Sequence, residues 1–178
     1  MNEESRDAFV LVGEGAFQVY DSTNSLLFSQ TLQEMFSLPN VYVLGGDWRG
    51  YQYLVSSADE LNDPQSVVQV FDPSSMSLDP LVDLGSFQAA ILSGDIVAAV
   101  DGPAFVDWCN KNQLDGIPEG HCVSPVRYAF LSGYDPRLDV KPISTIVYIN
   151  LAAKLRVKMQ DMGIEPGGPP PDDFFEGV

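Results

Sequence analysis

The sequence predicts an α+β domain with a mostly antiparallel central sheet and helices packed against it. Up to residue 84, segments rich in β-branched and aromatic residues come in adjacent pairs, each joined by a turn with Gly, Asp or Pro. After residue 84 the apolar residues recur mainly at helical spacing. Strands followed by helices are typical of the α+β class. The 178 residues fit one domain, which we expect over residues 1–162, before a flexible, acidic, Pro- and Gly-rich tail at 163–178.

Three hairpins and one helix are expected in the first half of the chain. The expected strands lie within residues 8–20 around the turn GEG, in 41–44 with 51–55, and in 66–71 with 78–84. Between the first two hairpins, residues 25–36 place apolar side chains along one helical stripe, which Pro39 and Asn40 end.

The second half is expected to be mainly helical. A short helix is predicted at 86–92 and a longer one from Asp101 to Asn112, because Asp-Gly-Pro is typical of a helix start. Residues 122–131 and 138–140 are expected to be extended. A last helix is expected to begin at Pro142 or Ser144, with a face along Ile146, Ile149 and Ala153 and with Val147, Leu151, Leu155 and Met159 beside it.

The turn of the second hairpin raises a functional question. The string GGDWRGYQYLV (residues 45–55) gathers glycines and amphipathic aromatic residues, which are enriched at protein–protein hot spots. The same residues also suit a plain hairpin, in which Trp48 clamps the turn and Tyr51 and Tyr53 lie on one strand face. The string lacks the features of a phosphate loop or a metal-ligand set, so we interpret it as a structural turn.

Charge is the clearest compositional signal. The formal net charge is −16, and residues 50–110 contain no Lys or Arg. The acidic residues of that segment are Asp59, Glu60, Asp63, Asp72, Asp79, Asp83, Asp95, Asp101 and Asp107. An acidic field repels nucleic acid and anionic lipid and attracts basic proteins, although acidity also serves solubility alone. We therefore expect no nucleic-acid partner.

Membrane insertion and export are not expected. No apolar run approaches the roughly 18 residues that a membrane span needs. The acidic N-terminus MNEESRD is unlike a signal peptide. We therefore expect a cytoplasmic protein without a membrane partner, in which Cys109 and Cys122 are free thiols.

The chain lacks a catalytic signature. Nucleophilic catalysis by a thiol needs a base facing it, and the one histidine, His121, is the sequence neighbour of Cys122. Adjacent side chains point to opposite sides of an extended chain. Two cysteines and one histidine do not complete a usual four-ligand zinc site. We predict no enzyme activity, no cofactor and no metal.

Several stretches together resemble one group of bacterial proteins. LGGDWRGYQYLV is similar to the pattern Phe-Gly-x-Asp-Trp-Leu-Gly-Arg-Gln-Phe-Ala of immunity-type domains of the SUKH superfamily and of type VI secretion immunity proteins. The matching positions are Gly45, Asp47, Trp48, Gly50 and Gln52, followed along residues 9–160 by Val70, Phe71, Asp72, Pro73, Phe105, Trp108, Cys122, Val123, Phe130, Leu131, Gly133, Tyr148 and Leu155. Arg49 and Tyr51 depart from the pattern, which commonly has Leu and Arg there.

The resemblance implies a small cytosolic SUKH-like domain that neutralises a cognate toxin by direct binding and has no catalytic residues. The acidic segment suits a basic toxin domain as partner. Two alternatives stay open: a general interaction or regulatory module of the same fold, and an enzyme that uses His121 with Cys109 or a carboxylate. The candidate partner-binding residues are Arg49, Tyr51, Asp59, Glu60, Asp63, Asp79, Asp83 and Asp95.

Overall fold

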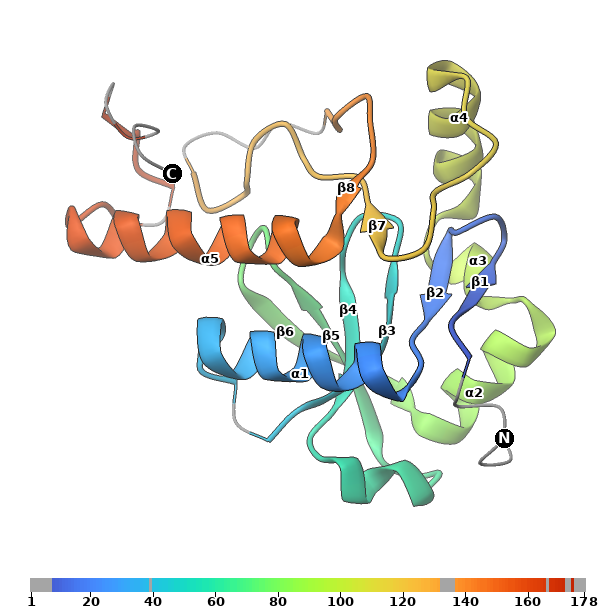
Figure 1. The fold of residues 1–178 in the computed structure, drawn as a ribbon. Coiled ribbons are helices and arrows are strands. Elements are labelled where there is room, and N and C mark those ends of the chain that lie inside the picture. The colour runs from blue at the N-terminus through green and yellow to red at the C-terminus, as the bar shows by residue number, and fades with distance from the viewer. Residues whose placement is uncertain (1–7, 39, 132–136, 166, 172–173, 175–178) are drawn as a thin grey trace.

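The central element is a six-stranded antiparallel sheet in which each strand pairs with the next one along the chain (Figure 1). The computed structural model describes residues 8–38, 40–131, 137–165, 167–171 and 174. The strands are β1 (Val10–Val12), β2 (Phe17–Val19), β3 (Tyr42–Asp47), β4 (Gln52–Val55), β5 (Val67–Asp72) and β6 (Ser77–Asp83). The three predicted hairpins are confirmed, and so is the α+β class with helices packed against a mostly antiparallel sheet.

Helices cover both faces of this sheet (Figure 1). They are α1 (Ser22–Phe36), α2 (Leu84–Ser93), α3 (Ile96–Ala99), α4 (Gly102–Asn112) and α5 (Thr145–Asp161), with the 3₁₀ helix η2 (Ala58–Asn62) between β4 and β5. An aspartate side chain accepts a backbone N–H at the start of three of them: Asp21 before α1, Asp83 before α2 and Asp101 before α4. A small ribbon of β7 (His121–Cys122) and β8 (Ile143–Ser144) precedes α5.

The sheet separates two hydrophobic cores. One core packs α1 and α5 on residues such as Val43, Leu54 and Phe71. The other packs α2, α3 and α4 on Phe17, Tyr53 and other residues of the opposite face. Successive side chains of a strand point to opposite faces, so β4 contributes side chains to both cores. All four residues of β4 are therefore buried.

Three parts of the chain differ from the expectation. Helix α3 and η2 were not predicted, because four or five residues are too few to show a helical period. The segment expected to be extended over 122–131 has strand pairing only at its start, after which Pro125 makes an isolated bridge to Leu138 and residues 128–131 form a turn. The predicted starts of α4 and α5 are confirmed. Pro39 and Gly133 lie outside the described residues.

The tail expected over residues 163–178 contributes a residue to the first core. Phe174 is fully buried there, and the ammonium group of Lys158 on α5 lies 5.7 Å from the centre of its ring. Upstream, the amide of Gly167 donates a hydrogen bond of 2.8 Å to the carbonyl of Phe130. A Pro- and Gly-rich composition does not exclude docking, because one aromatic side chain supplies a large apolar area.

Replacing Phe174 by Ala tests this docking. We expect a loss of about 3–5 kcal/mol in the free energy of unfolding, as for other buried Phe to Ala changes. Met162→Ala is the control, because that side chain is 43% exposed and its loss should cost at most about 0.5 kcal/mol. Urea denaturation measures both losses. If the two variants lost equally little unfolding free energy, Phe174 would not belong to the core.

Gly50 and Gly94 allow a matched test of packing at the β3–β4 turn. Both have positive φ angles, +84° and +83°, so an Ala at either position pays a similar backbone strain. A Cβ on Gly50 would lie 2.6 Å from Cε1 of Tyr148, whereas nothing lies within 4 Å at Gly94. Gly50→Ala should therefore destabilise by about 1–3 kcal/mol more than Gly94→Ala in urea denaturation. Equal losses would show that strain alone acts at Gly50.

Candidate partner-binding site

The turn between β3 and β4 is built around the buried carboxylate of Asp47. Its Oδ1 accepts hydrogen bonds from the backbone N–H groups of Arg49 (2.9 Å) and Tyr51 (3.1 Å). Its Oδ2 lies 3.4 Å from Nη2 of Arg49 and accepts a 3.3 Å bond from the hydroxyl of Tyr53. Backbone bonds from Asp47 to Tyr51 and from Gly50 to Asp47 close the hairpin. The carboxylate thus fixes both the backbone of the turn and the position of Arg49.

Trp48 joins this turn to two other parts of the fold. Its side chain is 2% exposed, and its indole N–H donates a 2.8 Å bond to the carbonyl of Val100, directly after α3. Its own carbonyl accepts a 2.7 Å bond from the amide of Val123, directly after β7. Trp48 thus ties the hairpin to the end of α3 and to the segment after β7.

The two candidate contact residues of the turn have structural interactions of their own. The guanidinium carbon of Arg49 lies 4.8 Å from the ring centre of Tyr51 and 5.7 Å from that of Trp48, in addition to the ion pair with Asp47. The side chain of Arg49 is 29% exposed, and Tyr51 is half-buried. Both side chains reach the surface, but the charge of Arg49 is already compensated by the turn.

The acidic candidates gather mainly at the other end of β4. Asp59 and Glu60 belong to η2, and Asp63 follows it. The start of α2 lies against this segment, because the amides of Leu84 and Gly85 donate bonds of 2.8 and 2.9 Å to the carbonyls of Ser66 and Pro64. Asp83 therefore joins this group, whereas Asp79 lies on the edge strand β6 and Asp95 lies after the far end of α2.

Several of these carboxylates also stabilise local structure. Asp83 caps α2 and accepts bonds from the amide and hydroxyl of Ser86, and these bonds lower the pKa of Asp83. Glu60 accepts from the amide of Ser56, and Asp63 from that of Gln65. Asp59, Asp63, Asp79 and Asp95 are exposed, so they retain access to solvent.

The structure brings all cation-poor elements together on one part of the molecule. Between residues 7 and 110 the sequence has fourteen acidic residues and one basic residue, Arg49, which leaves −13 of the formal −16 charge in this part. The six strands of the large sheet and helices α1 to α4 lie within or almost within that stretch. Apart from Arg49, which is paired with Asp47, every charged side chain of the sheet and of α1 to α3 is acidic.

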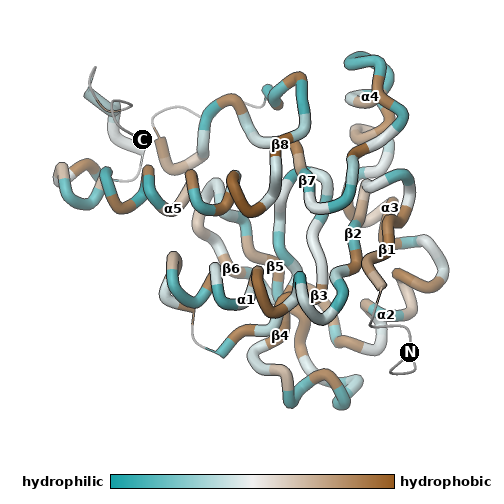
Figure 2. Tube along the Cα trace, in the orientation of Figure 1, coloured by the Kyte–Doolittle hydropathy of each residue, from teal (hydrophilic) through white to brown (hydrophobic). Residues whose placement is uncertain are grey.

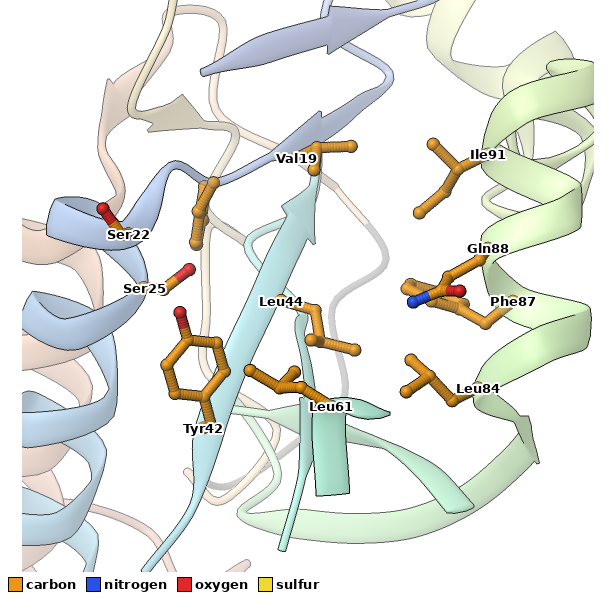
Figure 3. A pocket seen from close by; sticks show the side chains of 11 residues that line it. Val19, Ser22, Ser25, Tyr42, Leu44, Leu61, Leu84, Phe87, Gln88 and Ile91 are labelled. Carbon is orange, nitrogen blue, oxygen red and sulfur yellow. The ribbon is translucent and has the colours of Figure 1, made fainter. Parts of the chain in front are cut away.

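An apolar pocket opens on this negative side, on the sheet face that carries α2 (Figure 3). Its volume of ≈ 50 Å³ is several times the 10–15 Å³ or so that one water molecule needs. The residues that line it come from five elements and the segment before α1: Val19, Tyr20, Ser22, Ser25, Tyr42, Leu44, Leu61, Leu84, Phe87, Gln88 and Ile91. Leu44 lies at its centre, between α1 on one side and α2 on the other (Figure 3).

Sequence reasoning missed this pocket. Its apolar residues are scattered over more than seventy positions and follow the ordinary periods of a strand and a helix. Nothing local distinguishes a core residue such as Phe105, which is 3% exposed and does not line the pocket, from a pocket wall such as Ile91, which is half-buried. The only usable signal was the absence of Lys and Arg, which indicated the region but not the cavity.

Cys109 and Cys122 are free, buried thiols. Burial raises the pKa of Cys122 to about 12 and also raises that of Cys109 above its ordinary value, so both stay protonated at neutral pH. Nδ1 of His121 lies 2.8 Å from the carbonyl oxygen of Glu119. Among the described residues, no group of three or more His, Cys, Asp or Glu side chains is arranged to hold a metal ion.

Comparison with known proteins adds no relative. No protein-family model, no curated protein and no solved structure matches the chain. In the part of the chain that the structure describes, no helix has both the length and the apolar character needed to cross a membrane.

Burial makes Asp47 a source of pH-dependent stability. It raises the pKa of this carboxyl from 3.8 to about 6, against the opposing effect of Arg49 and the hydrogen bonds. Between these two values the folded chain keeps a proton that the unfolded chain releases, so stability falls as pH rises. Above about pH 7 both states are ionised and this contribution is constant.

Replacing Asp47 by Asn removes this titration and keeps the shape of the side chain. We expect the difference in unfolding free energy, native chain minus variant, to fall by roughly 2 kcal/mol from pH 4 to pH 7 and then to level off. Urea denaturation at a series of pH values measures it. A difference that is flat over this range would show that Asp47 has an ordinary pKa.

Proposed function

We propose that this chain is a non-catalytic binding protein of the immunity type, which neutralises a basic toxin domain in the cytoplasm by direct contact. The observation that carries the proposal is the segregation of charge: fourteen acidic residues against one paired arginine over residues 7–110. A surface of one sign attracts a partner of the opposite sign and raises the association rate by roughly 10- to 1,000-fold at low salt. The resemblance of the GGDWRG segment to immunity domains supports the same function.

The acidic end near η2 is the expected first contact. Asp59 is exposed and Glu60 half-buried, and they lie beside the start of α2, where Asp83 adds a third carboxylate. These three carboxylates together produce a strong local electric field. They are in contact with water before binding, so the free chain does not bear the cost of burying their charges. Basic side chains of a partner are therefore drawn to this end of the sheet.

Finding the partner is the first experiment. The tagged chain is co-expressed with the products of the genes that adjoin its own, and stoichiometric complexes are isolated. A large secreted toxin with a basic domain, whose toxicity is suppressed by co-expression, is the expected result. Recovery of a housekeeping protein instead would favour the general interaction module, and absence of any complex would contradict the proposal.

Charge reversal then tests the surface. We expect the double change Asp59→Lys with Glu60→Lys to lower the association rate at low salt by roughly tenfold, with little change at high salt. The matched control is Asp115→Lys with Glu119→Lys, which changes the net charge equally at two exposed positions outside the acidic stretch. Stopped-flow fluorescence measures both rates. Equal effects of the two pairs would mean that only the net charge matters, and a salt-independent rate would refute electrostatic attraction.

A further inference from the structure

The apolar pocket between α1 and α2 is flanked by acidic residues on the elements that form it. Ser22, Leu61 and Leu84 line it, and each directly follows an acidic residue in the sequence: Asp21, Glu60 and Asp83. All three carboxylate residues are half-buried, so they are in contact with solvent as well as with the fold. The pocket therefore has an apolar lining, and the three carboxylates that adjoin its lining residues in the sequence, here called its acidic border, lie on elements on both the α1 side and the α2 side.

The interior of the pocket suits one aliphatic side chain. Figure 3 shows Val19, Leu44 and Leu61 on its floor and the α2 residues Phe87 and Ile91 on its wall. Figure 2 shows hydrophobic residues among those of α2, the helix that contributes four of the lining residues. Hydroxyl groups of Tyr42 and Ser25 and the amide of Gln88 give it a few polar atoms (Figure 3), as in many binding pockets.

We infer that this pocket is the anchor site for one apolar side chain of a basic protein segment, whose Lys or Arg side chains lie against the acidic border. The inference rests on the proposed function and assigns its contact surface. The charge pattern selects this occupant: among residues 19–91, which contribute every wall of the pocket, Arg49 is the only cation and is held by Asp47. An acidic ligand would meet repulsion from each bordering element, and an uncharged one would gain nothing from them.

Binding of three fluorescent peptides to the full chain tests the inference. The first is a short lysine-rich peptide with one central leucine, the second has serine in place of that leucine, and the third has glutamates in place of the lysines. We expect the leucine peptide to bind roughly tenfold more tightly than the serine peptide, because burial of a leucine side chain favours binding by this amount or more. The glutamate peptide should not bind. Fluorescence anisotropy measures the three dissociation constants at low salt.

A pocket-filling variant and its control test whether the leucine of the peptide binds in this pocket. Gln88→Trp places a large side chain in the pocket from the half-buried wall of α2 and should abolish the advantage of leucine over serine. Leu92→Trp adds an aromatic ring to the same helix at a side chain that is 74% exposed and does not line the pocket, and it should keep the advantage. In the native chain, the methyl NMR signals of Leu44, Leu61 and Ile91 should shift on addition of the leucine peptide and not of the other two peptides. This measurement tests the site without any variant.

The outcomes separate the two proposals. Equal binding of the leucine and serine peptides, or an unchanged leucine advantage in Gln88→Trp, overturns the pocket inference and leaves the electrostatic proposal standing. If neither lysine-rich peptide binds better than the glutamate peptide at low salt, the attraction of basic partners itself is refuted.

Discussion

The buried carboxylate of Asp47 is the interaction on which the arrangement of the layers depends. A carboxylate in a dry interior is tolerated only when donors surround it, and here two backbone amides, a guanidinium and a phenol do so. Both amides belong to the four residues after Asp47, so the chain has to fold tightly back around the carboxylate.

This tight turn brings the other elements to defined positions. Trp48 bonds on one side to the end of α3 and on the other to the segment after β7. Gly50 leaves just enough room for Tyr148 of α5, which belongs to the opposite core. One turn therefore connects both helical layers to the sheet, and a change at Asp47, Trp48 or Gly50 acts on the whole fold rather than on the hairpin alone.

The sequence predicted the features that depend on residues close together in the chain. It missed the features that depend on tertiary contacts. The hairpins, α1, α4 and the start of α5 follow from turn residues, caps and period, and all were found. The role of Gln18 was not foreseen, because its amide binds the carbonyl of His121 and the amide of Gly120, more than a hundred residues away. Phe174 was assigned to a flexible tail for the same reason: composition does not show which core accepts one aromatic ring. For the site, charge indicated the region, but the pocket exists only once η2, α1 and α2 meet around the sheet.

Charge and shape have different roles in such a surface, and this decides how a specific partner is recognised. A net charge of −16 attracts many basic proteins, because electrostatic attraction acts over about a Debye length and does not depend on fine shape. It mainly sets the association rate, whereas differences in residence time arise from short-range packing. At one end of β4, Arg49 and the aromatic residues of the turn around Asp47 contact one another and the rest of the fold. In the proposed complex, discrimination among basic partners is left to the apolar pocket at the other end of β4, because a partner side chain of the wrong size would bury less apolar area there.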